Sequence, residues 1–308
     1  MKQTFSIPSS NNKNKLAIYV WRAKKQKLAI QLIHGMAEFA ERYEPFIHYL
    51  NKHDITVIAH DHVGHGHSVD PNHPEYGFIA EQHPVEVILE DIHHVRNVIH
   101  TAFPELTIVG LGHSMGSFAL RLACVKYPND YAGVIFMGSG SAPTLLSFAN
   151  LLANIANYFD PHTPNKLIHN ATFAFYPLHY HEPYHPLNWI SLSKANRRIY
   201  SHDPLLGFTF TGNGFYTLFH LVKWANHPLW FTHFPKELPT LFVSGADDPI
   251  GQYGKGVKKI ARNLERHGVH NVRYYLFNQL RHEILNEDHP LQIMDTIYEW
   301  LQEEIMND

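Results

Sequence analysis

The chain has 308 residues but a single cysteine, Cys124, so no disulfide can form within it. No apolar run approaches the roughly 20 residues of a membrane-spanning helix, and the polar stretch 3–15 offers no signal-peptide core. Charge of one sign is not in excess either, because 25 basic residues face 28 acidic ones. This balance excludes the positive field that nucleic-acid binding needs. We therefore expect a soluble cytoplasmic protein with no nucleic-acid partner and at most transient contact with a membrane surface.

Long uninterrupted apolar segments are missing, but short apolar runs alternate with amphipathic stretches. Such alternation predicts a mostly parallel sheet with helices on both faces. The predicted strands are Leu28–Ile33, Ile55–Ala59, Leu106–Gly110, Val134–Gly138, Thr240–Ser244 and Val272–Phe277. The predicted helices are Arg42–Lys52, Pro84–Ala102, Ser117–Tyr127, Gly254–His267 and a last helix from about Pro290. Two earlier runs, Thr4–Ile7 and Leu16–Trp21, predict an edge hairpin, and the basic cluster within residues 22–27 is expected in a solvated hairpin turn.

Residues 110–116 read Gly-Leu-Gly-His-Ser-Met-Gly and follow an apolar run. A strand that leads into Gly112-x-Ser114-x-Gly116 and then into a helix is typical of the nucleophile elbow of the α/β-hydrolase fold. Gly112 and Gly116 leave room for the tight turn that exposes the Ser114 hydroxyl. The following helix directs its positive end towards that hydroxyl. Ser114 is therefore the candidate nucleophile.

A serine nucleophile needs a base and an acid that orients this base, in the chain order Ser, Asp or Glu, His. Asp247 and Asp248 are the acids that directly follow a predicted core strand, and we prefer Asp248 because the next residue is a proline. His282 lies five residues beyond the last predicted strand, at the loop position where the base is needed. Three other histidines lie before that strand or at the terminal helix: His267, His270 and His289.

The oxyanion hole needs two backbone N–H groups. The first is expected from Met115, the residue after the nucleophile. The second is expected from the loop after an early core strand, where Gly35 permits a close turn that would direct the N–H of Met36 at the site.

The strand–helix alternation breaks after the strand that follows the elbow, in an interval too long for an ordinary connection. This interval contains a predicted helix at Phe148–Phe159 and then many aromatic residues. We predict a hydrolase core of residues 1–141 and 239–308, with an inserted cap of residues 142–238. An aromatic-rich cap over Ser114 would form an apolar pocket.

Histidine is unusually frequent, with 26 residues. The clusters are His60, His62, His65 and His67, and His179, His181 and His185. No H-E-x-x-H motif occurs, and a single cysteine excludes a thiolate-rich zinc site. We expect no metal site, and we interpret these histidines as solvated or as capping loops.

Several segments resemble motifs of the monoacylglycerol lipases and bacterial lysophospholipases, which are α/β-hydrolases. The segments are His34-Gly35-Met36-Ala37-Glu38 with Glu41-Arg42-Tyr43, Asp61-His62-Val63-Gly64-His65-Gly66-His67-Ser68, Gly112-His113-Ser114-Met115-Gly116, Ser244-Gly245-Ala246-Asp247-Asp248-Pro249 and Arg281-His282-Glu283. Residues 203–211 resemble the cap of the bacterial members. The chain departs from many eukaryotic members at Ala37, where they have glycine, and at Phe39, where they often have histidine.

The resemblance implies a serine carboxylic-ester hydrolase that forms an acyl-enzyme on Ser114 and needs no cofactor. Its implied substrate is a lipid ester with one acyl chain, a monoacylglycerol or a lysophospholipid. Two alternatives stay open. An aminopeptidase or amidase of the same fold would need a cap acid for the substrate amine, for which Glu182 and Asp203 are candidates. The other alternative is a catalytically inactive binding protein of the hydrolase fold.

Overall fold

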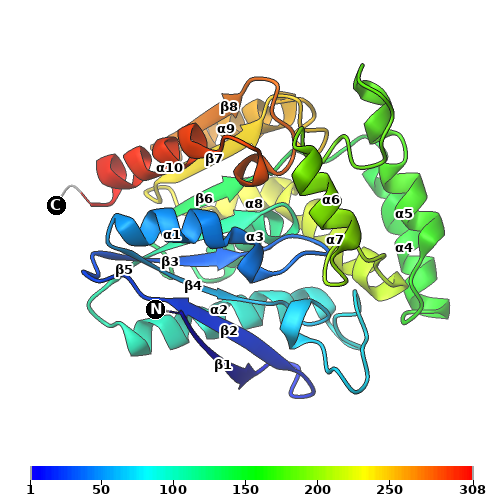
Figure 1. Cartoon of the computed structure of the whole chain (residues 1–308), viewed down its shortest axis with the longest axis horizontal. Coiled ribbons are helices and arrows are strands. Elements are labelled where there is room, and N and C mark those ends of the chain that lie inside the picture. Colours follow the sequence, from blue (N-terminus) through cyan, green and yellow to red (C-terminus); the bar gives the residue numbers. More distant parts are fainter. Residues whose placement is uncertain (1, 307–308) are drawn as a thin grey trace.

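The computed structural model describes residues 2–306, which form one eight-stranded sheet between two layers of helices (Figure 1). The strand order is β1-β2-β4-β3-β5-β6-β7-β8. The strands are β1 (Lys2–Pro8), β2 (Lys15–Trp21), β3 (Leu28–Ile33), β4 (Ile55–His60), β5 (Thr107–His113), β6 (Gly133–Met137), β7 (Thr240–Gly245) and β8 (Val272–Phe277). From β4 to β8 all neighbours are parallel, so the ends of these strands meet at one edge of the sheet.

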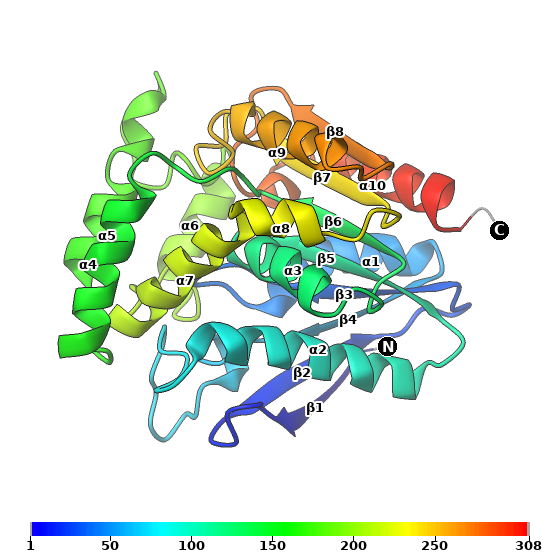
Figure 2. The same ribbon diagram turned by 180° about the vertical axis from the view of Figure 1, so that it is seen from behind.

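Helices cover both faces of this sheet, and each face has its own apolar core. In Figure 1, the helices α1 (Glu44–Lys52) and α10 (Leu291–Glu304) lie in front of the sheet. The opposite face, turned to the viewer in Figure 2, carries α2 (Pro84–Ala102), α3 (Met115–Lys126), α8 (Pro228–His233) and α9 (Lys255–Arg266). The interior strands are buried on both sides, which explains their nearly continuous apolar sequences.

The segment between β6 and β7 contains most of the remaining helices. They are α4 (Leu146–Phe159), α5 (Lys166–Phe173), η3 (Tyr176–His179), α6 (Lys194–His202) and α7 (Gly212–Ala225), followed by α8. Both views place α4, α5 and α6 beside the sheet, beyond the ends of the parallel strands. The segment is anchored to the elbow helix, because Trp230 Nε1 of α8 donates to the Arg121 carbonyl at 2.7 Å.

The N-terminal hairpin is confirmed, since β1 and β2 pair antiparallel at the sheet edge. The hairpin turn predicted for residues 22–27 is wrong. β2 pairs with β4 and not with β3, so these residues connect two strands that are not neighbours. Their basic side chains are exposed, as expected. Three short helical turns complete the fold: η1 (Ala40–Tyr43), η2 (Gly66–Ser68) and η4 (Ile284–Asn286).

The loop after β4 holds a stack of buried imidazoles. His60, His62 and His65 are each at most 1% exposed. The rings of His62 and His65 contact each other and His34, and the ring of His60 contacts that of His62. Burial lowers the pKa of His60 to about 3 and that of His65 to about 4, so both are neutral at physiological pH. The expectation of solvated histidines is therefore wrong for these three, and Phe208 and Phe210 of the β6–β7 segment cover the ring of His65. His67 is exposed, as expected, and His65 Nδ1 lies 3.0 Å from the Val63 carbonyl oxygen of the same loop.

Within residues 2–306, no helix combines the length and the apolar character required to cross a bilayer. No three histidine, cysteine, aspartate or glutamate side chains in that range are arranged to hold a metal ion. Cys124 lies in α3 and is 1% exposed.

Candidate active site

Ser114 sits in a strained turn between β5 and α3. Its backbone angles are φ 51° and ψ −119°, a conformation that L-residues rarely adopt. The turn is tight because the flanking residues have no side chain. A Cβ on Gly112 would lie 2.5 Å from the carbonyl oxygen of Gly116, and a Cβ on Gly116 would overlap the carbonyl oxygen of Ile33. The sequence thus forms the strand–turn–helix unit that presents the Ser114 hydroxyl at the end of the sheet.

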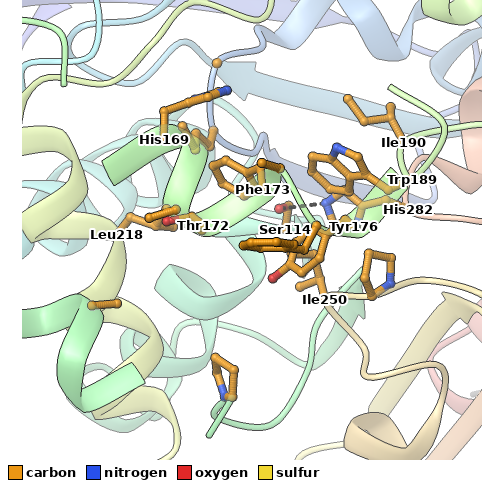
Figure 3. Close-up of a pocket in the computed structure, with 18 of the residues that line it drawn as sticks. Ser114, His169, Thr172, Phe173, Tyr176, Trp189, Ile190, Leu218, Ile250 and His282 are labelled. Atoms are coloured by element: carbon orange, nitrogen blue, oxygen red, sulfur yellow. Dashed lines mark hydrogen bonds between the residues drawn. The ribbon is translucent and has the colours of Figure 1, made fainter. Parts of the chain in front are cut away.

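The structure brings Ser114, His282 and Asp248 together in a hydrogen-bonded chain. Ser114 Oγ lies 2.9 Å from His282 Nε2, the contact drawn as a dashed line in Figure 3. His282 Nδ1 lies 3.0 Å from Asp248 Oδ2. The three residues come from the ends of β5, β8 and β7, respectively. This order of hydroxyl, imidazole and carboxylate allows His282 to accept the hydroxyl proton while Asp248 orients the ring.

Asp248 is fully buried and held in place by two further donors. Ser244 Oγ donates to Asp248 Oδ2 at 3.2 Å, and the Ile250 N–H donates to Asp248 Oδ1 at 2.8 Å. The neighbouring Asp247 is half-buried, and its carbonyl oxygen accepts from the Tyr180 hydroxyl at 2.8 Å. Of the two adjacent acids, Asp248 is therefore the one beside His282.

The two expected oxyanion donors belong to segments that meet at Ser114. Met115 is fully buried and is the first residue of α3, so its N–H has no partner within the helix and points along the helix axis towards the elbow. Met36 lies in the loop after β3 and lines the same cavity as Ser114. The strands that carry these loops are neighbours, with Ile33 opposite Gly112 in the register.

A buried polar cluster lies behind the serine, and sequence reasoning assigned it no role. Glu38 Oε1 accepts from the Gly35 N–H at 2.6 Å, from the Tyr43 hydroxyl at 2.8 Å and from His113 Nδ1 at 2.8 Å. Burial would raise the pKa of Glu38, but His113 and Arg42 outweigh burial and lower this pKa to about 2. Burial lowers the pKa of His113, yet the Glu38 carboxylate raises it above its ordinary value. Glu38 and His113 both lie in motifs recognised in the sequence. The contact between them depends on the conformation of the loop after β3, which the motifs do not specify.

A cavity of about 700 Å³ opens over Ser114 and His282. Its wall is made mainly by apolar side chains from α4, α5, α7 and the segment after α5 (Figure 3). These include Leu152, Ile168, Phe173, Tyr176, Trp189, Leu218 and Phe219. Trp189 also contacts the His282 ring, with 5.3 Å between ring centroids. The cavity can therefore shield a long apolar group from water at the point where the serine hydroxyl is exposed.

Known proteins resemble this chain in sequence. The family model described as Serine aminopeptidase, S33 matches residues 24–289. Monoglyceride lipase of Rattus norvegicus is 32% identical over 186 residues, which are 58% of this chain and 52% of that protein. The chain thus spans about half the length of the curated relatives that it matches.

Solved structures resemble the chain over nearly its whole length. A highly thermostable carboxyl esterase from Bacillus coagulans, in complex with glycerol, has a TM-score of 0.91 and 24% identity, with 99% of both chains covered. A soluble variant of monoglyceride lipase from Saccharomyces cerevisiae, in complex with a substrate analog, has a TM-score of 0.76 and 18% identity, with 98% of this chain and 94% of that one covered. These likenesses confirm the predicted α/β-hydrolase fold.

Proposed function

Since the chain belongs to the serine aminopeptidase S33 family of α/β-hydrolases, we propose that it is a serine carboxylic-ester hydrolase of lipids with one acyl chain. The observation that carries this proposal is the hydrogen-bonded chain from Ser114 through His282 to Asp248 beneath an apolar cavity. The sequence similarity to a monoglyceride lipase supports the same substrate class.

In the proposed reaction, Ser114 Oγ attacks the ester carbonyl while His282 Nε2 takes its proton. The N–H groups of Met36 and Met115 hold the negative oxygen of the tetrahedral intermediate. His282 then returns the proton to the leaving alcohol oxygen, and the acyl group stays on Ser114. Water, deprotonated by His282, then attacks the acyl-enzyme, and His282 returns this proton to Ser114 Oγ as the fatty acid leaves. Asp248 keeps the imidazole in the required tautomer and stabilises its charged form. No step uses a cofactor.

The proposed substrates are monoacylglycerols and lysophospholipids, because a single acyl chain suits a long apolar cavity. Helices α4, α5 and α7, together with the segment after α5, contribute most of that apolar wall. In this proposal residues 142–238 act as the cap that selects the acyl chain, and residues 1–141 and 239–308 supply the catalytic groups.

The aminopeptidase alternative needs a free carboxylate near Ser114 to bind the substrate amine. Glu182 forms ion pairs with Arg281 at 2.5 Å and with Arg197 at 3.4 Å, so its charge is already compensated. The Asp203 carboxylate accepts from the Leu205 N–H. Among residues 2–306, those that line the cavity include neither acid. The carboxylates that do line the cavity, those of Glu38 and Glu283, are paired with His113 and Arg42. This distribution of charge favours an ester with an apolar acyl group over an aminoacyl substrate.

The proposed chemistry is tested by replacing the nucleophile and the base. Ser114→Ala and His282→Ala should each lower kcat/KM for p-nitrophenyl butyrate by at least about 10³-fold, because the triad acts as a unit. Both side chains are reached from the cavity, so their loss should leave the thermal unfolding midpoint nearly unchanged. Hydrolysis that persists in either variant would contradict the triad. A wild-type chain that cleaves aminoacyl p-nitroanilides faster than esters would favour the aminopeptidase, and one inert on both would favour a binding protein.

A further inference from the structure

His113, the residue before the proposed nucleophile, bridges two loops of the active site. Its ring lies at the end of β5 and is buried, with 3% of the residue exposed. On one side, His113 Nδ1 lies 2.8 Å from Glu38 Oε1, in the loop that carries Met36. On the other side, His113 Nε2 lies 3.4 Å from the backbone carbonyl oxygen of His282. The ring therefore connects the proposed oxyanion loop to the loop of the proposed base.

Both partners of this ring are hydrogen-bond acceptors. A backbone carbonyl can only accept, and an ionised carboxylate can only accept. Glu38 is ionised, because the Gly35 N–H and the Tyr43 hydroxyl donate to its Oε1 and the Arg42 guanidinium lies 3.7 Å from its Oε2. A neutral imidazole has one N–H, so it would point a lone pair at one of these two oxygens. Both contacts are hydrogen bonds only if His113 carries hydrogen on both nitrogens, as an imidazolium does.

Charged groups on the neighbouring elements fit this state. The Arg42 guanidinium binds Glu283 and lies 3.7 Å from Glu38 Oε2, so two carboxylates face two cations in the cluster. The titratable groups around His113 come from the loop after β3, from η1, from α6 and from the loop after β8. They are His34, Glu38, Arg42, Tyr43, Tyr200, His282 and Glu283. Burial lowers the pKa of His34 well below its ordinary value, so it adds no charge.

Resting on the proposed function, we propose that Glu38 and His113 are positioning residues, and that their ion pair sets the alkaline limit of activity. Glu38 holds the turn before Met36 through the Gly35 N–H. The imidazolium of His113 holds the carbonyl of His282, which fixes the base relative to Ser114. When His113 loses a proton, one of its two hydrogen bonds is lost and the loop of the base is released. The positive ring also lies 4.9 Å from the His282 ring, which disfavours a resting positive charge on the base.

The proposal predicts a specific change in the pH profile of kcat/KM. The wild-type chain should lose activity on the alkaline side as His113 deprotonates. Glu38→Gln removes the anion that stabilises the imidazolium, so the alkaline limb should move to lower pH. At neutral pH this variant should lose about tenfold to a hundredfold in kcat with little change in KM, because the misplaced base affects the transition state. His113→Gln keeps an N–H donor without a titrating proton and should therefore abolish the alkaline limb.

Long-range ¹H–¹⁵N spectra of the full chain, with ¹⁵N-labelled histidine, provide a readout that needs no substrate. At neutral pH both nitrogens of His113 should be protonated in the wild type, and one should be deprotonated in Glu38→Gln. Glu90→Gln, which removes a surface carboxylate on α2, is the matched control and should change neither profile nor spectrum. A neutral His113 in the wild type, or a Glu38→Gln profile equal to that of the wild type, would overturn the proposal. If the wild type hydrolysed no ester, the proposed function would fail, while the spectra would still decide the charge of His113.

Discussion

Asp247 and Asp248 are adjacent carboxylates after β7, and their environments differ sharply. Asp248 is inaccessible to solvent and contacts His282, whereas Asp247 is half-buried. Asp248→Asn should lower kcat by about 10⁴-fold, because the amide can hold the wrong imidazole tautomer and cannot stabilise the imidazolium. Asp247→Asn keeps the carbonyl that Tyr180 binds and should cost far less. Steady-state kinetics of the two variants on one ester test this ranking. A larger loss in Asp247→Asn would mean that Asp247 is the acid that orients His282.

At the same scale, Ser114, Asp248 and His282 could be identified as site residues from the sequence. Each follows a predicted parallel strand, and parallel strands end at the same edge of the sheet, so the residues after them lie close together. The sequence does not indicate the partnership of Glu38 with His113. That contact joins residues 75 positions apart through the shape of a loop, which no local pattern encodes. The buried state of His60 and His62 escapes sequence reasoning for a related reason. A polar ring in a glycine-containing loop normally lies in water, and here other segments cover it.

At the scale of elements, the elbow tolerates no extra atom at Gly116. A Cβ there would overlap two backbone oxygens, those of Ile33 and His34, which belong to β3 and its following loop and cannot move aside. Gly116→Ala should therefore lower the free energy of unfolding by about 3 kcal/mol or more, at the upper end of the cost of overpacking. Urea denaturation measures this change. At Gly251 the nearest atom lies 3.3 Å from an added Cβ, so Gly251→Ala is the control and should have a smaller effect. Equal losses would mean that the elbow has more room than this geometry allows.

The ends of helices with a clear apolar stripe could be predicted to within a few residues. The predicted helix Pro84–Ala102 has the bounds of α2, because one face is apolar and a proline marks its start. The helices α5 to α8 were not predicted. Most of α7 is buried on all sides, so it has no polar face to reveal its period, and it begins with Gly-Asn-Gly after the capping Thr211 side chain. The helices α5, α6 and α8 have only six to nine residues, too few for a periodic signal.

At the scale of the whole molecule, the cavity lies between the β6–β7 segment and the strand ends that carry Ser114 and His282. Each methylene removed from water contributes about 0.8 kcal/mol, so kcat/KM for p-nitrophenyl esters should rise steeply from acetyl to octanoyl. Leu152→Asp would place a charge in the apolar wall and should flatten that rise, while acetyl-ester hydrolysis is retained. Rates measured across the series test this expectation. A preference for acetyl esters in the wild type would contradict the lipid substrate and leave the serine chemistry intact.

The overall arrangement was predictable because its signals are repeated along the chain. Six predicted core strands correspond to β3 through β8, and the break in alternation coincides with the long helical segment between β6 and β7. The order of the strands in the sheet was harder to predict from the sequence. Neither the length nor the charge of residues 22–27 reveals that this connection passes from β2, beside β4, to β3 on the far side of β4. Such pairing depends on contacts between distant segments.

The burial of Cys124 gives the molecule an internal reporter of its own opening. Its thiol lies on α3, the helix that begins directly after Ser114, and burial raises the pKa of that thiol above its ordinary value. Thiol reagents react with the thiolate of an accessible sulfur, so labelling requires an opening of the packing around α3. With one cysteine in the chain, no other site contributes to the signal. The labelling rate therefore measures how often the elbow helix opens, and its dependence on ligand would show how strongly an occupied cavity holds the elbow closed.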